Sequence, residues 1–389
     1  MPADDLAGAV RPARWRVLVV HSATIAVLLG GVASYYDSSS GFTALIGFGG
    51  KQAASVVPAL RDLPHRATRG TAGYDGQFYV QMAVDPLLED PLTDRAMDVA
   101  PLRARRILLS WTAYVLGFGR PAWILQVFAL QNVLAWIALT FVLRRWFALT
   151  TARGLALWLA TVFSAGLLWS IRFALLDGPS LLLIALAVAS VESGRRWLAS
   201  GICGIAGLAR ETNVLSLFGL IDPAEWKSAR SIARQAGFVV LALVPLAIWF
   251  DYIHSIYRSQ IFTSGETLAR PFAGAVWRTH LALEEFTGGA YQRPAMTFAM
   301  VAAFVTQIGL LVARPRWQEP WWRIGVAYAA LLPLLGQPLW TGTPPTVIRV
   351  ELPLLVAFNV GLRTVERRDA FWLLLACGNV SLLLQPLFR

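Results

Sequence analysis

Charged side chains interrupt or border the apolar segments of this chain. Burying an unpaired charge in apolar surroundings is costly, so such residues usually face other protein groups or water and often belong to a functional site. Guanidinium groups bind anions and carboxylates accept protons, so a cavity that gathers both could combine anion binding with acid–base chemistry. The charged residues concerned are Arg172, Asp177, Arg210, Glu211, Asp251, Arg349 and Glu351.

A purely structural role would explain some of these residues. Arg172 could pair with Asp177, and Arg349 with Glu351, as ion pairs between helices. Arg172 and Arg349 could also reach from helix ends toward water, but that would not explain Arg210. A structural bundle has little reason to gather so many charges on one side, so we expect the set as a whole to serve a function.

A further carboxylate, Asp75, lies in the polar stretch Gly-Tyr-Asp-Gly-Gln-Phe-Tyr. In a helix that begins near Tyr74, Asp75 and Tyr79 are four residues apart and share a face. Tyr74, Phe78 and Met82 form the adjacent apolar stripe. This spacing predicts a short amphipathic helix that lies on the membrane and presents one carboxylate beside the cavity. On spacing alone, an ordinary surface helix that Asp75 caps is the favoured alternative.

The composition is typical of a polytopic membrane protein, which we expect to form one integral-membrane domain over residues 1–389. Of the 389 residues, 56% are hydrophobic and 15% charged, with a mean hydropathy of +0.55, whereas soluble domains average about 25% charged residues. The net charge of +11 comes from short basic clusters between apolar runs. That is the pattern of cytoplasmic turns, and it argues against nucleic-acid binding. Cys203, Cys377 and the four histidines lack metal-site spacing, so no cofactor is indicated.

The first apolar run, Val17–Ser34, follows three arginines. A basic start and small residues at the end could form a cleaved signal peptide. The run approaches the roughly 20 residues that cross a bilayer, and further spans follow, so we expect an uncleaved span with a cytoplasmic N-terminus. The loop 35–106 then lies outside. The next apolar run, 107–118, is too short to cross and should lie at the outer surface or pack on the bundle.

The remaining pattern predicts an all-α bundle of about nine full transmembrane helices, with a second outer loop at residues 253–293. The short turns that this topology places in the cytoplasm are all basic. The expected spans are Val17–Ser34, Pro121–Leu143, Gly154–Ile171, Leu175–Val191, Ala236–Tyr252, Pro294–Val312, Trp322–Leu339, Ile348–Leu362 and Ala370–Leu387.

The apolar segment 198–220 is interrupted at its centre by Arg210-Glu211-Thr212-Asn213, and basic residues flank it on both sides. A single span would place one of these basic clusters outside. Two half-helices that meet at Arg210 keep both clusters inside, so we favour a re-entrant helical hairpin. Such broken helices are tolerated at membrane depth where protein or water surrounds the break. The hairpin apex then points toward the outer ends of the charged spans, and the polar groups converge on one cavity near the outer leaflet.

Three short motifs resemble the GT-C class of membrane glycosyltransferases. They are Tyr74-Asp75-Gly76-Gln77-Phe78-Tyr79 in the long loop after the first span, Leu102-Arg103-Ala104-Arg105-Arg106-Ile107-Leu108, and Leu208-Ala209-Arg210-Glu211-Thr212. The first resembles the Trp-Asp-x-x-x-Tyr element of the branch that includes GPI mannosyltransferases, and all three look like an uncharacterised bacterial group. Many GT-C enzymes carry an acidic pair soon after the first span, where this chain has only Asp37.

This resemblance implies transfer of a sugar from a polyprenyl-phosphate donor to an acceptor outside the membrane, with inversion. Asp75 would be the base that orients and deprotonates the acceptor hydroxyl, and Asp37 is the alternative for this role. Cations would hold the donor phosphate as negative charge grows on it. These phosphate-binding residues would be Arg210, Arg349, Arg105 and Arg106.

Other residues would support this chemistry. Glu211 would position Arg210, backbone N–H groups after the hairpin apex would face the anion, and Gln77 and Tyr79 would contact sugar. His254, Tyr257 and Arg270 in the second outer loop would contact donor or acceptor. The further supporting residues are Tyr74, Asp177, Arg172 and Glu351.

The implied partners are a polyprenyl-phosphate-linked sugar, a glycan, lipid or protein acceptor, and membrane lipids. The implied location is the plasma (inner) membrane of a bacterium, with the active site facing the periplasm or outside. Broken helices and buried charges would also suit a transporter or flippase of a lipid-linked or anionic substrate. A non-catalytic membrane subunit of glycan assembly is a third alternative.

Overall fold

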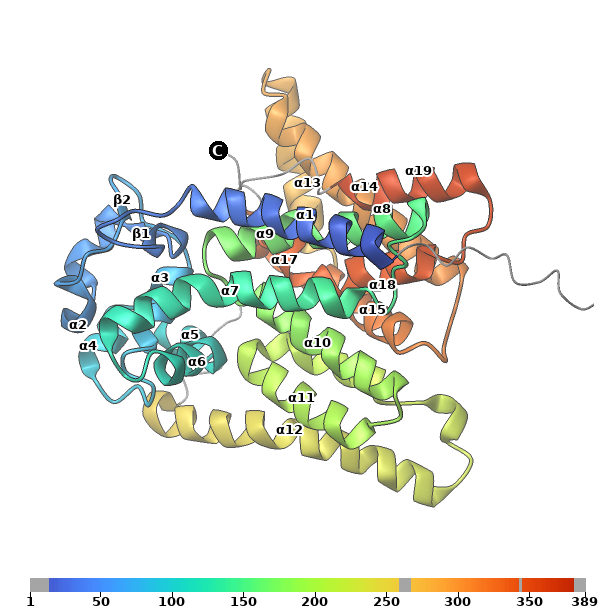
Figure 1. Cartoon of the computed structure of the whole chain (residues 1–389), viewed down its shortest axis with the longest axis horizontal. Helices are drawn as coiled ribbons and strands as arrows, with labels where there is room; N and C mark the ends of the chain where they lie inside the picture. The colour runs from blue at the N-terminus through green and yellow to red at the C-terminus, as the bar shows by residue number, and fades with distance from the viewer. Residues whose placement is uncertain (1–13, 259–266, 343–344, 381–389) are drawn as a thin grey trace, which may run out of the picture.

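The computed structural model describes residues 14–258, 267–342 and 345–380, and the described chain is mostly helical (Figure 1). Within these ranges, five helical segments are long and apolar enough to cross a membrane. They are α1 (Arg14–Ala33), α7 (Pro121–Leu143), the pair α8 (Ala152–Val162) and α9 (Ala165–Arg172), α12 (Ala229–Tyr257) and α14 (Gln292–Ala313). The expectation of a helical membrane protein is therefore confirmed at this level.

The other expected spans are shorter helices. Proline residues contribute to this, because Pro333 lies in the short 3-10 segment η6 (Leu332–Leu334) that ends α15, and Pro353 stands at the start of α18. The last expected span, Ala370–Leu387, extends beyond the described residues. The number of nine spans thus stays a prediction. The shorter helices are α10 (Asp177–Glu192), α15 (Pro320–Leu331), α18 (Leu352–Leu362) and α19 (Arg368–Gly378).

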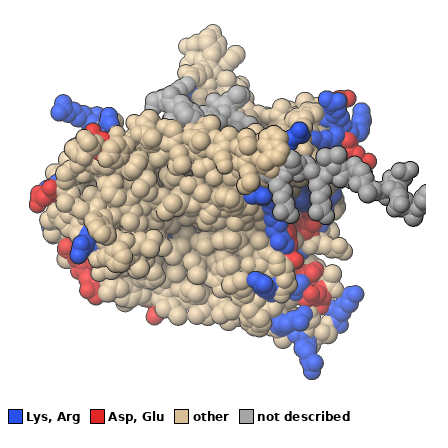
Figure 2. Space-filling view, in the orientation of Figure 1, with Lys and Arg blue, Asp and Glu red and all other residues tan. Residues whose placement is uncertain are grey.

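The basic turns gather at one end of the molecule. Figure 2 shows Lys and Arg concentrated at the right-hand end, separated by a largely uncharged band from the charges at the other end. Arg153 donates to the carbonyl of Val365 at 2.9 Å and Arg314 to that of Thr364 at 2.9 Å, so turns distant in sequence contact one another. This is the arrangement expected if these turns share one side of a membrane.

The first loop folds against the opposite end of the helices. It begins with η1 (Thr43–Leu45), η2 (Gly50–Ser55), α2 (Pro58–Arg61) and a parallel pairing of β1 (Phe48–Gly49) with β2 (Ala67–Thr68). It continues through α3 (Gly76–Met82), α4 (Pro91–Arg95) and α5 (Ala100–Ala104) to α6 (Leu108–Leu116). The short α6 packs against α7. Of the two alternatives for residues 107–118, packing on the bundle is therefore the one observed.

The helix at Asp75 is not the amphipathic surface helix that the spacing predicts. Every residue of α3 is buried, because β1, α5, α6 and α7 pack around it. Ser110 donates from its hydroxyl to the carbonyl of Tyr79 at 2.7 Å. A Cβ added at Gly76 would lie 2.2 Å from the carbonyl oxygen of Phe173, so only glycine permits this close approach to α9.

The chain turns back at Arg210, while the re-entrant membrane hairpin expected there stays a prediction. Arg210 is extended between α11 (Arg196–Ala209) and η3 (Glu211–Gly219). Arg196 at the start of α11 pairs with Glu225, in η4 (Pro223–Glu225), at 2.6 Å, so both arms of the hairpin begin at the basic end. The second arm is a 3-10 segment rather than the expected half-helix. Its placement in a membrane stays a prediction.

The second loop contains α13 (Ala273–Thr287), which packs against α14 and α16 (Gln337–Trp340). The helix α12 before it extends to Tyr257, five residues beyond the expected span end at Tyr252. A short helix, α17 (Val347–Val350), then brings Arg349 beside α9 at the loop end of the bundle.

Candidate active site

Asp75 lies at the N-terminus of α3, but its side chain makes no capping hydrogen bond. Instead, Arg103 donates from Nη2 to its Oδ1 at 2.9 Å, and Nη2 of Arg349 lies 3.7 Å from its Oδ2. The Asp75 side chain is 33% exposed, whereas those of Arg103 and Arg349 are 8% and 5% exposed. Burial raises the pKa of Asp75, but the two arginines outweigh burial and lower this pKa below its usual value. Asp75 is thus an ionised, reachable carboxylate held by buried cations.

Arg103 is a central residue that the sequence analysis missed. It follows Asp98 by five residues and binds both oxygens of that carboxylate, at 2.9 and 2.8 Å. It also donates to the hydroxyl of Tyr79 at 3.2 Å, and its guanidinium lies over the Phe78 ring. The signal was present in the Leu-Arg-Ala-Arg-Arg motif, since Arg103 and Arg106 are three residues apart and can share a helix face.

Arg106 connects the first loop to the hairpin apex. It binds Glu211 with two hydrogen bonds, at 2.8 and 2.6 Å, and donates to the hydroxyl of Tyr79 at 3.3 Å. Glu211 hydrogen-bonds to Arg106 and acts on Arg210 electrostatically, so its expected role in positioning Arg210 stays a prediction. Arg105, which precedes Arg106 in the chain, also interacts electrostatically with Glu211. It is not among the arginines that act on Asp75 most strongly.

Asp177, the first residue of α10, lies buried between two arginines. Arg210 donates to its Oδ1, and Arg349 donates to its Oδ2 at 3.1 Å. Arg349 also donates to the hydroxyl of Thr346 at 3.1 Å and lies over the ring of Tyr74. The ion pairs suggested from sequence, Arg172 with Asp177 and Arg349 with Glu351, are wrong, because the fold brings Arg210 and Arg349 to Asp177 instead.

These contacts form one continuous network at the loop end of the helices. It runs from the first loop through Tyr79 to the hairpin apex, α10 and α17. It contains equal numbers of positive and negative groups, so it has no excess charge of its own. Its members are Arg103, Arg106, Arg210 and Arg349 on one side and Asp75, Asp98, Asp177 and Glu211 on the other.

The space beside Arg210 is small. A cavity of about 10 Å³ is lined by Asp177, Arg210 and Arg349, which is close to the room that one water molecule needs. The Nε atom of Arg210 has no hydrogen-bond partner among the described residues. Arg210 thus reaches an anion only if neighbouring side chains move, whereas Asp75 is already accessible.

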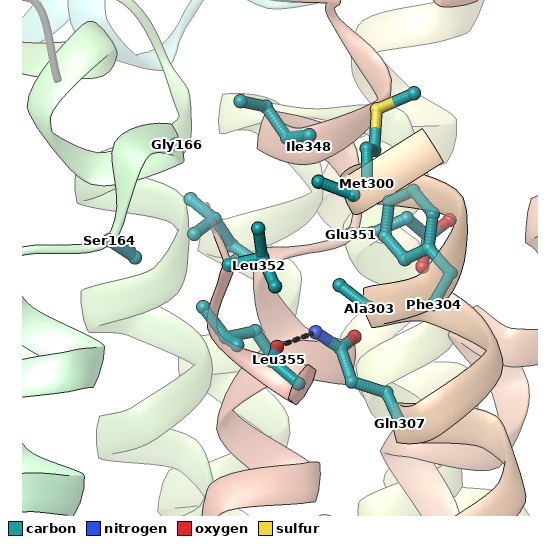
Figure 3. Close-up of a pocket in the computed structure, with 13 residues that line it drawn as sticks. Ser164, Gly166, Met300, Ala303, Phe304, Gln307, Ile348, Glu351, Leu352 and Leu355 are labelled. Carbon is teal, nitrogen blue, oxygen red and sulfur yellow. Dashed lines mark hydrogen bonds between the residues drawn. The ribbon is translucent and has the colours of Figure 1, made fainter. Parts of the chain in front are cut away.

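Glu351 lies behind this network, in a second cavity of about 30 Å³ (Figure 3). It is 1% exposed, and neither carboxylate oxygen has a hydrogen-bond partner in the described part of the chain. Apolar side chains such as Met300, Phe304 and Leu352 surround it, and Gln307 donates to the carbonyl of Gly378 at 2.8 Å nearby. Arg210 is the charge that acts on Glu351 electrostatically. Glu351 therefore lies next to the network but forms no ion pair with any of its described members.

Asp37, the alternative acid, lies in a turn outside the network. Its Oδ1 accepts from the backbone N–H groups of Ser39 and Ser40 at 2.9 and 3.1 Å. Hydrogen bonds from Ser39 lower the pKa of Asp37. No arginine pairs with it within the described ranges. Its contacts are those of a residue that fixes a turn.

Several other expected site residues have different surroundings. Gln77 is buried, accepts from the N–H of Gly49 at 3.1 Å and donates to the carbonyl of Ala72 at 2.7 Å, so it holds the loop together. Tyr257 interacts with Asp94. The other residues outside the network are Arg172, which lies between the rings of Tyr35 and Phe173, and the exposed Asp251, His254 and Arg270.

No protein-family model matches this chain, and no curated protein does. Among solved structures, the chain is similar to ArnT from Cupriavidus metallidurans in its apo state, with a TM-score of 0.47 and 16% sequence identity. The match covers 92% of this chain and 62% of the ArnT chain, so this chain spans less than two thirds of the length of that protein. A likeness this distant supports no inference about activity, and the function has to be inferred from the residues of the network.

Proposed function

We propose that this protein is a membrane glycosyltransferase. It would move a sugar from a polyprenyl-phosphate donor to an acceptor hydroxyl at the loop end of the bundle, which corresponds to the periplasmic or outer face of a bacterial inner membrane. The observation that carries the proposal is the contrast between Asp75, one-third exposed, and its buried partners Arg103 and Arg349. A reachable carboxylate next to fixed cations suits a reaction that removes a proton and develops an anion.

The donor phosphate would compete with Asp75 for Arg349. The network is balanced in charge, so an incoming anion must replace a carboxylate on one of the arginines. The contact between Arg349 and Asp75 is the longest ion pair of the network, at 3.7 Å, and is beyond hydrogen-bonding range. In this proposal the phosphate takes the place of Asp75 on Arg349, while Arg210 and Arg106 add positive charge behind it.

Donor binding would then prepare Asp75 as a base. Once the phosphate neutralises Arg349, one of the three arginines that lower the pKa of Asp75, the others being Arg103 and Arg106, is lost as a counter-charge. The pKa of Asp75 rises toward its usual value, and the carboxylate becomes a better proton acceptor. Arg103 would keep it oriented through the 2.9 Å contact.

The transfer step follows from this arrangement. The acceptor oxygen forms a bond to the anomeric carbon while its proton passes to Oδ2 of Asp75. The bond between that carbon and the phosphate oxygen breaks, and its electron pair leaves with the polyprenyl phosphate. Attack from the face opposite the phosphate inverts the anomeric carbon. The phosphate is stable as an anion and needs no general acid.

The test uses the purified protein in lipid nanodiscs with a panel of polyprenyl-phosphate sugars. Wild-type protein should release polyprenyl phosphate and form a glycosylated product, and Asp75→Asn should abolish both. Asp98→Asn is the matched control, because Asp98 also binds Arg103 but is not proposed to accept a proton. Retention of transfer in Asp75→Asn, or its loss in Asp37→Asn alone, would contradict the assignment. Movement of intact donor across liposomes without release would favour a transporter.

A further inference from the structure

A groove of about 720 Å³ opens beside the loop-side end of α1, away from the charged network. One wall is the small-residue face of α1 and the other comes from the first loop and the end of α9. None of its residues belongs to the network of Asp75. The lining residues that matter here are Gly30, Gly31, Ser34, Arg66, Thr68 and Arg172.

Two arginines stand in this groove without a counter-ion. Arg172 is fixed, since its Nη1 donates to the carbonyl of Ala44 at 3.0 Å and its guanidinium lies 4.5 Å from the ring centres of both Tyr35 and Phe173. Arg66 is exposed. Neither arginine forms an ion pair with any described residue, and the charge of Arg66 acts unfavourably on Arg172. Two neighbouring cations, with no carboxylate among the described residues that line the groove, are complementary to an anion.

The α1 wall is apolar and open. A Cβ added at Gly30 would meet no atom within 4 Å, and Val27, which also lines the groove, is 53% exposed. Because α1 is one of the helices that can cross a membrane, this face would contact acyl chains. The arginines lie at its loop-side end, where a membrane presents its headgroups.

We propose that this groove binds an anionic phospholipid. Its phosphate lies between Arg66 and Arg172, and one acyl chain follows α1 past Gly30. The groove has the volume of sites that hold whole small ligands rather than a single ion. The site is separate from the proposed transfer reaction and does not depend on it.

Binding is measured by native mass spectrometry of the protein in detergent, titrated with phosphatidylglycerol, phosphatidylcholine or inorganic phosphate. Phosphatidylglycerol should bind best. Arg66→Gln should weaken its binding about fivefold, because one interfacial charge contributes about 1 kcal/mol. Arg69→Gln is the matched control, since Arg69 is an exposed arginine of the same loop that does not line the groove.

A second variant tests the acyl-chain wall without changing charge. Gly30→Leu should fill the groove and reduce phosphatidylglycerol binding while leaving inorganic phosphate unaffected. Unchanged phosphatidylglycerol binding in both Arg66→Gln and Gly30→Leu would overturn the proposal. It would also fail if inorganic phosphate bound as tightly as the lipid and Gly30→Leu had no effect, because the ligand would then be a free anion. Monodisperse elution of each variant controls for folding.

Discussion

Nη2 of Arg349 lies 3.7 Å from Oδ2 of Asp75, while Nη1 of the same guanidinium donates to Oδ2 of Asp177 at 3.1 Å. Asp177 therefore fixes Arg349, and Asp75 holds it only weakly. A group that is fixed on one side and loosely bound on the other can exchange its weaker partner without moving. This asymmetry is why the proposed donor phosphate replaces Asp75 rather than Asp177.

The first prediction concerns donor affinity. If the phosphate displaces Asp75 from Arg349, then Asp75→Asn removes a competing anion. We expect this variant to bind polyprenyl phosphate up to about fivefold more tightly than wild type, since a partly exposed ion pair contributes up to about 1 kcal/mol. Microscale thermophoresis in detergent would measure it. Arg349→Gln should bind more weakly, and Asp98→Asn should match wild type. Weaker binding in Asp75→Asn would show that the phosphate sits elsewhere.

The second prediction concerns pH. The pKa of Asp75 is lowered in the folded protein because Arg103 and Arg349 outweigh its burial. A carboxyl with a lowered pKa stabilises the fold fully above its unfolded pKa of about 4, and this stability is lost as the pH falls through the folded pKa. The melting temperature of wild type should thus exceed that of Asp75→Asn by a constant amount from pH 7 to about pH 5. The difference should shrink below about pH 4; a difference that grows on acidification would refute the ion pairing.

The third prediction compares two buried carboxylates. Asp177→Asn leaves Arg210 and Arg349 without their shared counter-ion, and we expect it to lower the free energy of unfolding by about 3–5 kcal/mol. The carboxylate oxygens of Glu351 have no hydrogen-bond partner among the described residues, so Glu351→Gln should change this free energy by less than about 1 kcal/mol. Unfolding in a denaturing detergent would measure both. A large loss in Glu351→Gln would reveal a partner that binds the carboxylate.

The fourth prediction concerns the contact between the first loop and the hairpin. A double-mutant cycle with Arg106→Gln and Glu211→Gln should give a coupling energy of about 1–3 kcal/mol, as expected for a two-point, largely buried pair. The cycle can be measured from thermal unfolding. A coupling near zero would show that the loop is held by its apolar contacts alone.

Sequence patterns predicted the helical membrane architecture and several members of the network. The expected span Pro121–Leu143 coincides with α7, because a long apolar run bounded by proline and arginine leaves little freedom. The charges at 177, 210, 211 and 349 do come together with Asp75. Their partners were wrong, because pairing depends on which helices are neighbours, and α9 and α10 face the hairpin and α17 in a way that no local pattern encodes.

Other errors have equally physical causes. The spacing of apolar residues in α3 predicted a surface helix, because such a pattern does not reveal what covers the polar side of the helix. In the structure, Gln77 and Gln81 on this helix are buried and hydrogen-bond to backbone groups. Arg103 was missed because three arginines within four residues look alike in sequence. Only the turn of α5 separates Arg103, which faces Asp75, from Arg105.

The network has a consequence for the order in which the protein is made. Asp177 emerges from the ribosome well before Arg210, and Arg349 is added only near the end of synthesis. Until the α17 region has been inserted, Asp177 and Asp75 lack one of their cations. A nascent chain that stops before residue 345 thus carries an incompletely neutralised carboxylate at the loop end of its helices. We therefore expect chains truncated before α17 to be less stable than the chain that includes it.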